Sequence, residues 1–411
     1  MTNNADLDER QQKGIVIAAT SRLVKKGAGW LVPSQSLPTK YTVVLNDEGG
    51  FCSCPDHAKT GRACKHQIAV QLVIKRELNA DGDVEVTGGF RITYSQQSWT
   101  AYNAAQTGEK ELFMKLFRDL CAGIVQPPQG RGRPRLPVAD MVFAAGLKVY
   151  RGNSARRFMG DMKDAQAMGL VAKVPHFNSV LNYLDDEMIT PALQEMIRLS
   201  ALPLKAIETD FAVDSTGFSS TQLVGQWKGA KYGDKHLRME HDWLKCHAMT
   251  GVKTNIVVAV EIGAANSGDA PRFRPLLDAT TANFNVRRVL GDKAYSSYAN
   301  MDFAAERGVE PFVMFRDNAT TNSGSEAWDR MFHLLSFNRR EFMKAYHKRS
   351  NVEATFSAIK RVFGDFVRSK NKTAQVNEIL LKILCHNLRQ IIFAMHELGI
   401  VPSFDGDPAD A

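Results

Sequence analysis

Residues 206–218 read AIETDFAVDSTGF, an apolar stretch with the β-branched and aromatic content of a buried strand, and Asp214 lies inside it. Residues 237–249 and 253–263 indicate a second and a third strand, residues 285–292 (NVRRVLGD) a fourth that ends on Asp292, and residues 310–315 a fifth. Helices are expected at 271–284, 297–308 and 349–366. The order βββαβαβα predicts an α/β domain in which helices flank a five-stranded sheet.

The last of these helices has two different faces. Four polar residues fall within about 60° of one another at 100° per residue and share one edge: Tyr346, Arg349, Glu353 and Lys360. Four apolar residues form a separate stripe suited to burial against a sheet: Val352, Phe356, Ile359 and Phe363. Burial alone explains the apolar stripe but gives no reason for the polar alignment.

Three acids occupy comparable places in this order: Asp214 on the first strand, Asp292 after the fourth and Glu353 on the last helix. This arrangement resembles the ribonuclease-H-like catalytic core of DDE transposases, with a mixed five-stranded sheet. The spacing Tyr-x2-Arg-x3-Glu-x6-Lys is similar to the signature of one large group of bacterial insertion-sequence transposases. The resemblance covers residues 205–400.

The resemblance implies a two-metal-ion site that cuts and rejoins DNA, with Mg²⁺ or Mn²⁺ held by carboxylate oxygens. Asp214 is expected to bridge both ions, and Asp292 and Glu353 each to complete one shell. Arg349 and Lys360 are expected to contact DNA phosphate, which Tyr346 would orient. Four other acids are expected to be surface carboxylates or strand-end turn residues: Glu208, Asp210, Asp242 and Asp302.

The interval between the fifth strand and the last helix departs from the pattern. The best-known members of the group carry a large β-rich insertion here, whereas residues 316–345 are expected to form a polar loop. In those members an aromatic residue holds a flipped base. Trp328 is a candidate, with Trp227 and Trp243 as alternatives, but a tryptophan that anchors the core or a loop is the simpler interpretation.

A second motif lies near the start of the chain, in residues 51–67 (FCSCPDHAKTGRACKHQ). Cys52, Cys54, Cys64 and His66 supply four ligands, enough for a closed tetrahedral Zn²⁺ site of structural type. A chance cluster of reduced thiols is the alternative, and His57 is a spare ligand. A strand at 39–45 and a helix at 66–77 are expected beside the cluster. The pattern Cys-x-Cys then Cys-x-His resembles the SWIM zinc finger, here assigned to residues 14–80, and implies a module for DNA or protein recognition.

Residues 126–137 (QPPQGRGRPRLP) contain four prolines, two glycines and three arginines without an acid, and are expected to form an extended, solvated linker. Arg131 and Arg133 resemble the core of an AT-hook, which inserts arginine into the minor groove; a basic hinge is the alternative. Residues 138–204 have helical periodicity. They are compatible with a helix-turn-helix whose recognition helix spans 176–184, or with an ordinary helical packing domain.

Charge and composition agree with a partner that carries phosphate. The net charge is +8, and the segment from Arg339 to Lys372 contains ten Lys or Arg residues but only three acids. Such a segment suits double-stranded DNA, because neutralised phosphates release counterions; a solvated helix face is the alternative. The start of the chain is polar and no stretch approaches the ~18 apolar residues of a membrane span. We therefore expect a cytoplasmic location and no membrane partner.

These observations lead to one functional hypothesis and two rivals. The first is a transposase that binds the inverted ends of its own element, cleaves there and joins the 3′-hydroxyl to target DNA, as a homodimer because two ends must be cut together. The rivals are a non-catalytic, transposase-derived DNA-binding regulator and a protein-interaction scaffold built on the zinc module. The three acids argue against the regulator, and the position of the basic surplus argues against the scaffold.

Overall fold

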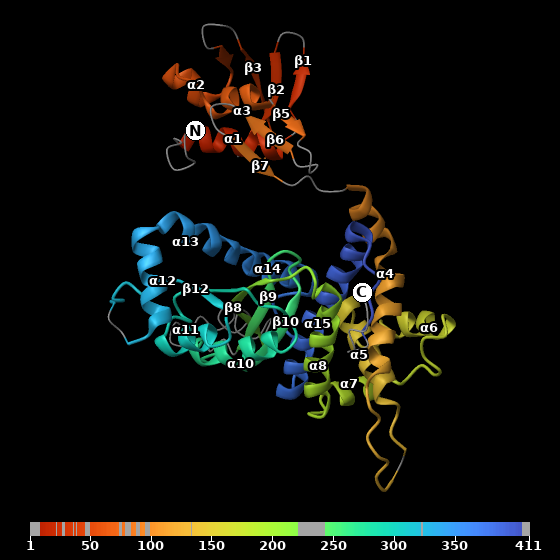
Figure 1. Cartoon of the computed structure of the whole chain (residues 1–411). Coiled ribbons are helices and arrows are strands. Elements are labelled where there is room, and N and C mark those ends of the chain that lie inside the picture. Colours follow the sequence, from red (N-terminus) through yellow and green to blue (C-terminus); the bar gives the residue numbers. More distant parts are fainter. Residues whose placement is uncertain are drawn as a thin grey trace, which may run out of the picture. The chain divides into compact units, whose positions relative to one another are not determined.

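The computed structural model describes residues 9–21, 23–26, 29–35, 37, 39–45, 50–73, 76–78, 84–87, 91–94, 99–132, 134–220, 243–321 and 324–404. The chain forms two compact units, Met1–Trp99 and Thr100–Ala411 (Figure 1). The earlier part of the second expected strand, residues 237–242, lies outside the described residues. No helix in the described part of the chain is long and apolar enough to cross a membrane.

The first unit combines small antiparallel sheets with helices. Its elements are α1 (Glu9–Thr20), β1 (Val24–Lys26), β2 (Gly29–Pro33), β3 (Lys40–Val44), β4 (Phe51–Cys52), α2 (Pro55–Thr60), α3 (Lys65–Val73), β5 (Arg76–Leu78), β6 (Val84–Thr87) and β7 (Arg91–Tyr94). The strands form sheets in the orders β1-β2-β3-β4 and β5-β6-β7, with antiparallel neighbours. The strand expected at 39–45 is confirmed by β3. The helix expected at 66–77 is shorter than predicted, since α3 ends at Val73 and β5 follows.

The second unit begins with a helical region and continues into a sheet with further helices. Its elements are α4 (Trp99–Ala122), α5 (Val138–Arg151), α6 (Met159–Ala167), α7 (Phe177–Leu184), α8 (Ile189–Ala201), η2 (Leu202–Leu204), β8 (Asp210–Ser219), β9 (Trp243–Gly251), β10 (Val257–Ala264), α10 (Ala270–Thr281), β11 (Arg288–Gly291), α11 (Tyr298–Ala305), β12 (Glu310–Val313), α12 (Glu326–Phe337), α13 (Arg339–Tyr346), η3 (His347–Arg349), α14 (Ser350–Phe363) and α15 (Lys372–Leu398).

The five strands of the second unit form one mixed sheet in the order β10-β9-β8-β11-β12. Strands β8, β9 and β10 pair antiparallel, whereas β11 pairs parallel with both β8 and β12. The expected α/β class and five-stranded mixed sheet are therefore confirmed. Successive residues of a strand point to opposite faces. Asp214 and Phe218 of β8 face α14, and Phe211 faces the α10 side, where its ring meets Phe284 edge to face.

The longest helix, α15, was not anticipated from the sequence and ties the helical region to the sheet. It contacts α5, α7, α8 and α14 as well as β10. Its Asn387 is fully buried and bonds the backbone N–H and carbonyl of Val257 in β10, while its amide also donates to Ser200 Oγ of α8. The helical region and the sheet consequently share one hydrophobic core.

Residues 126–137 connect α4 with α5, two helices that both contribute to this core. The described part has no helix or strand and projects from the ends of the two helices (Figure 1), as expected for a solvated segment. The Gln126 side chain accepts from the N–H of Val138, and the Gln129 side chain accepts from the N–H of Arg135. These bonds close the base of the segment, so that it forms a loop of the second unit.

The polar loop expected at 316–345 is wrong, because most of it is helical. Helix α12 begins where the Ser325 hydroxyl caps the N–H of Trp328, and it buries Trp328 and Met331. Helix α13 follows directly and buries Phe342. The apolar residues of this stretch do have helical spacing, but they are sparse among charged residues, and their burial depends on β12 and α11.

Candidate active site and zinc site

The central strands bring two of the three predicted acids together. The last register pair between β8 and β11 is Val213 with Gly291, so Asp214 and Asp292 follow on neighbouring strands at the next position. The Asp214 carboxylate accepts a hydrogen bond from the N–H of Ser215 at 2.8 Å. The Asp292 carboxylate accepts from the N–H of Ala294 at 2.9 Å, which fixes it in the turn after β11. Both side chains therefore have defined positions at the middle of the sheet.

The third acid approaches from the helix that crosses β8. Arg349, at the end of η3, lies between the acids: Nη1 is 3.1 Å from Oδ2 of Asp214 and Nη2 is 2.5 Å from Oε1 of Glu353. Val352 and Ile359 are fully buried and hold α14 against the sheet, as the apolar stripe predicts. The structure thus brings Asp214, Asp292, Glu353 and Arg349 into one site.

The pKa of Asp214 reflects the proximity of the other two acids. Burial raises the pKa of Asp214, and the carboxylates of Asp292 and Glu353 raise it further, while the Ser215 N–H and Arg349 act in the opposite direction. The Arg349 guanidinium supplies one positive charge against three carboxylates. A site with an excess of hard oxygen ligands suits a divalent cation.

The polar signature is not carried by one continuous helix, which corrects the sequence-based geometry. Tyr346 ends α13, Arg349 ends the 3₁₀ turn η3, and only Glu353 and Lys360 lie on α14. Arg349 nevertheless reaches Asp214, and it pairs with Glu353 four residues farther along the chain.

The residues expected to contact DNA lie in different surroundings. The guanidinium carbon of Arg349 lies 5.9 Å from the ring centre of Tyr346, so these two belong to the acidic site. Lys360 lies about two turns beyond Glu353 on α14, and its ammonium is 5.5 Å from the ring centre of Phe218. Arg131 is exposed in the loop between α4 and α5, and Arg133 lies outside the described residues.

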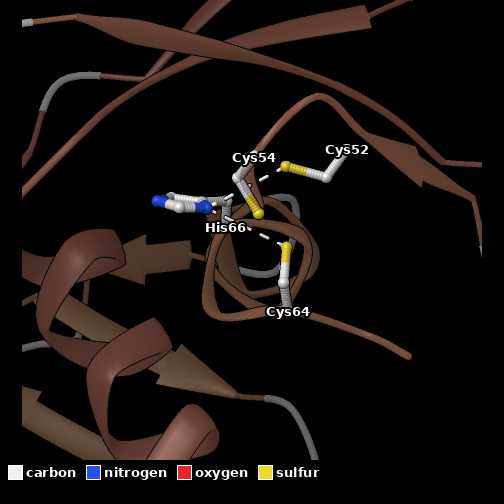
Figure 2. A group of neighbouring side chains, drawn as sticks. All are labelled: Cys52, Cys54, Cys64 and His66. Carbon is white, nitrogen blue, oxygen red and sulfur yellow. Dashed lines mark hydrogen bonds between the residues drawn. The ribbon is translucent and has the colours of Figure 1, made fainter. Parts of the chain in front are cut away.

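The first unit contains a compact ligand cluster, drawn in Figure 2. The ligand atoms of Cys52, Cys54, Cys64 and His66 all lie within 4.8 Å of one another, and all four residues are buried. Nδ1 of His66 is 3.9 Å from the sulfur of Cys52 and from that of Cys64, close to the edge length of a tetrahedron with Zn–S bonds of about 2.3 Å. The three sulfurs and Nδ1 therefore fit Zn²⁺.

One thiol of this cluster, that of Cys64, favours the thiolate form, whereas the pKa values of Cys52 and Cys54 are raised. A hydrogen bond from the Cys52 thiol lowers the pKa of Cys64 to about 3 and raises that of Cys52. A thiolate is the form that binds zinc. His57 is not part of the compact ligand group, and its Nδ1 donates to the carbonyl oxygen of Arg62 at 2.9 Å.

Two acids expected to be ordinary surface or turn residues are in fact buried. Glu208 is fully buried and accepts hydrogen bonds from the N–H groups of Lys253 and Thr254 in the β9–β10 turn. Asp210 is 3 % exposed and pairs with Arg287 and Lys348. Both do lie at the start of β8, but long-range partners, which sequence spacing does not reveal, decide their burial.

Trp328 follows the simpler interpretation of a tryptophan that anchors the core. Trp328 is buried, its Nε1 donates to the carbonyl of Thr320 at 2.9 Å, and its ring meets Tyr298 and Phe315 edge to face. Trp243 is half exposed at the start of β9. Trp227 lies outside the described residues.

Sequence reasoning missed the residues that hold the far end of α14. Two buried side chains of α15, Lys382 and Glu378, form hydrogen bonds with the segment that follows α14. The Lys382 ammonium donates to the carbonyls of Gly364 and Phe366, and Glu378 accepts from the N–H groups of Arg368 and Ser369. In the sequence, a lysine four residues after a glutamate looks like an ordinary ion pair on the surface of a helix. Only the tertiary structure shows that Glu378 and Lys382 are buried and hold the segment that follows α14, the helix that carries Glu353.

The mixed sheet and the acids on β8, after β11 and on α14 define a ribonuclease-H-like domain. Residues 206–388 match the family of the transposase DDE domain, and residues 41–75 match the SWIM zinc finger. The chain therefore contains a transposase DDE domain preceded by a SWIM zinc finger. No curated protein and no solved structure matches it.

Proposed function

We propose that this protein is a transposase that binds the inverted ends of its own mobile element, cleaves the DNA there and joins the freed 3′-hydroxyl to target DNA. The observation that carries the proposal is the convergence of Asp214, Asp292 and Glu353 on one face of the mixed sheet, with Arg349 between them. Binding alone gives no reason to gather three acids beside DNA, because like charges repel phosphate.

The acids are suited to hold Mg²⁺ or Mn²⁺. Asp214 interacts electrostatically with both other acids and would supply oxygen to both ions, while Asp292 and Glu353 would each serve one. Such ions activate a water or 3′-hydroxyl and stabilise the leaving oxygen. The turn after β11 and the anchored α14 keep the carboxylates in place without rearrangement of the backbone. Rigid ligands of this kind favour in-line displacement at phosphorus.

Other residues are assigned to substrate recognition. Arg349, once released from the carboxylates, and Lys360 would contact DNA phosphate, and Tyr346 would orient it. Arg131 and Arg133 of the exposed loop would contact the minor groove, and the helices of 138–204 would contribute to end recognition. Zn²⁺ held by Cys52, Cys54, Cys64 and His66 would stabilise the first unit as a recognition module. We expect a homodimer on DNA, because the two ends must be processed together.

The proposal is tested by excision in cells, with a marker placed between the ends native to this gene. Asp292→Asn keeps the size of the side chain and its acceptor for the Ala294 N–H, but removes one charged metal ligand. We expect a loss of excision of at least about 100-fold. Glu306→Gln, an exposed acid at the end of α11, is the matched control and should behave as wild type.

The leading alternative is a non-catalytic regulator derived from a transposase. It is separated from the enzyme by incubating purified protein with a labelled end and Mn²⁺. The enzyme nicks the end and Asp292→Asn does not, although both bind it. Binding by the wild type without any nicking or excision would overturn the enzymatic proposal in favour of the regulator.

A further inference from the structure

A second hollow lies on the sheet face that carries the acids, but toward the opposite ends of the strands. It has a volume of about 560 Å³ and is enclosed by β11, β12, α12, α13 and η3. We call it the basic pocket; it is lined by Arg288, Glu310, Phe312, Arg330, Met331, Leu334, Glu341, Lys344, Ala345 and Lys348. Neither the comparisons nor the catalytic proposal assigns it a role.

The charge of the basic pocket is positive, with four cations against two acids. The acids are already engaged: Glu310 pairs with Arg288 at 3.1 Å, and Glu341 accepts from the Asn338 amide at 2.7 Å. Arg330 and Lys344 are exposed and have no ion pair within the described ranges. Two cations that face a hollow without a partner are a ready site for an anion.

A buried acid outside the lining of the pocket pairs with two of its cations. Asp210 is 3 % exposed and lies 2.8 Å from the Lys348 ammonium, 3.0 Å from Arg287 and 3.8 Å from Arg288. Burial opposes ionisation of Asp210, but the hydrogen bonds from Lys348 and Arg287 outweigh it and hold its pKa below the ordinary value. Lys348 and Arg288 are therefore held beside the pocket before any ligand arrives, which lowers the entropic cost of binding.

The same turn serves both sites. Lys348 and Arg349 are consecutive in η3, yet Lys348 reaches Asp210 and Arg349 reaches Asp214 and Glu353. Asp210 and Asp214 are four residues apart on β8, a distance of about 13 Å at 3.3 Å per residue. At 3.4 Å per base pair, a duplex that ran past the acids in the direction of β8 would reach the basic pocket roughly four base pairs away.

The charge does not stop at the rim of the pocket. Arg339 and Arg340 are exposed on the same helix as Lys344, so positive charge continues along α13. A small free anion would need only the pocket, whereas a continuous track suits a polymer of phosphates. We propose that the basic pocket binds backbone phosphate of DNA beside the cleavage position, through Arg330 and Lys344 with Lys348 and Arg288 behind them. This inference rests on the proposed function.

The test compares two double variants in the full chain. Arg330→Gln with Lys344→Gln removes the two unpaired cations of the pocket. Arg274→Gln with Lys205→Gln removes two exposed cations elsewhere, Arg274 being on α10, which packs on the other face of the sheet. All four side chains are exposed, so both proteins are expected to melt at the wild-type temperature.

Binding is measured by fluorescence anisotropy with duplexes that carry the end native to this gene, at several salt concentrations. We expect the pocket variant to bind a duplex with a long flank about 10-fold more weakly and to lower the slope of log K against log salt by about 1 to 2. The defect should persist when the flank is scrambled, because phosphate carries no sequence, and should vanish on a duplex truncated at the cleavage position. The control variant should match wild type throughout.

The outcomes separate this inference from the proposed function. If wild type and pocket variant bind the long duplex equally well, the pocket is no DNA contact, while cleavage by the wild type leaves the proposed function intact. If the pocket variant loses only the thermal stabilisation produced by inorganic phosphate, the site takes a free anion and the inference is overturned. If wild type binds none of the duplexes, both the inference and the proposed function fail.

Discussion

Arg349 lies between Asp214 and Glu353, two carboxylates that are proposed to bind the metal ions. We expect its replacement by glutamine to destabilise the protein in the absence of metal and to strengthen metal binding. Without metal, Arg349→Gln leaves Asp214 and Glu353 without their positive partner. At 4 Å and an effective dielectric constant of 20, each pair is worth about 4 kcal/mol before desolvation. The Glu353 side chain is 56 % exposed, so solvent screening reduces the net loss to about 1 to 2 kcal/mol.

With metal, the sign reverses. In the wild type, Mg²⁺ must displace the guanidinium from Asp214 and Glu353, whereas in the variant the carboxylates are free. Removal of one positive charge beside the ions should strengthen Mg²⁺ binding by roughly 1.4 kcal/mol, which is about 10-fold. DNA cleavage should nevertheless fall, because Arg349 is assigned to phosphate once the ions are bound. A gain in metal affinity combined with a loss of activity is expected only if Arg349 and Mg²⁺ compete for the same two carboxylates.

The assay is calorimetric unfolding over a range of Mg²⁺ concentrations, supported by titration of Mg²⁺ into the folded protein. Arg349→Gln should melt about 2 to 6 °C below wild type in chelator and should gain more from Mg²⁺. Arg361→Gln, an exposed arginine on the same helix, serves as the control and should change neither quantity. Equal Mg²⁺ affinities of wild type and Arg349→Gln would refute the competition.

Three further predictions concern stability. Glu208→Gln should lower the free energy of unfolding by about 2 kcal/mol in chemical denaturation, because a buried carboxylate that accepts two N–H groups becomes a neutral amide; a change below 0.5 kcal/mol would contradict this role. His386 is fully buried and its pKa is lowered to about 4, so the unfolded chain binds its proton first as pH falls from about 7 toward 4. The free energy of unfolding should fall by up to about 3 kcal/mol across that range in the wild type and by less in His386→Gln. An equal pH dependence of the two proteins would contradict this prediction. Chelation of Zn²⁺, or Cys64→Ser, should lower the melting temperature of the unit Met1–Trp99 but not that of Thr100–Ala411, so an unchanged first transition would exclude a structural metal.

Sequence reasoning succeeded where the signal is local. Strand and helix periodicity located β8, β10, β11, β12 and α10, because each alternates or repeats within its own length. It failed for α12 and α13, whose few apolar residues are interrupted by charges, and it omitted α4 and α15. The four residues of the polar edge do not lie on one continuous α-helix, because the 3₁₀ turn His347–Arg349 separates Tyr346 from Glu353 and Lys360.

The sequence by itself determined which groups are available: three acids in strand, strand-end and helix contexts, and four soft ligands at the spacing of a closed metal site. Spacing along the chain suffices for the Cys/His cluster, since its members are separated by a short segment. Only the tertiary structure decided how distant groups neutralise one another, as Arg349 does for Asp214, and as Lys348 does for Asp210. Those pairs join residues more than 130 positions apart, and no local pattern encodes which acid a given cation will reach once the sheet and helices have packed.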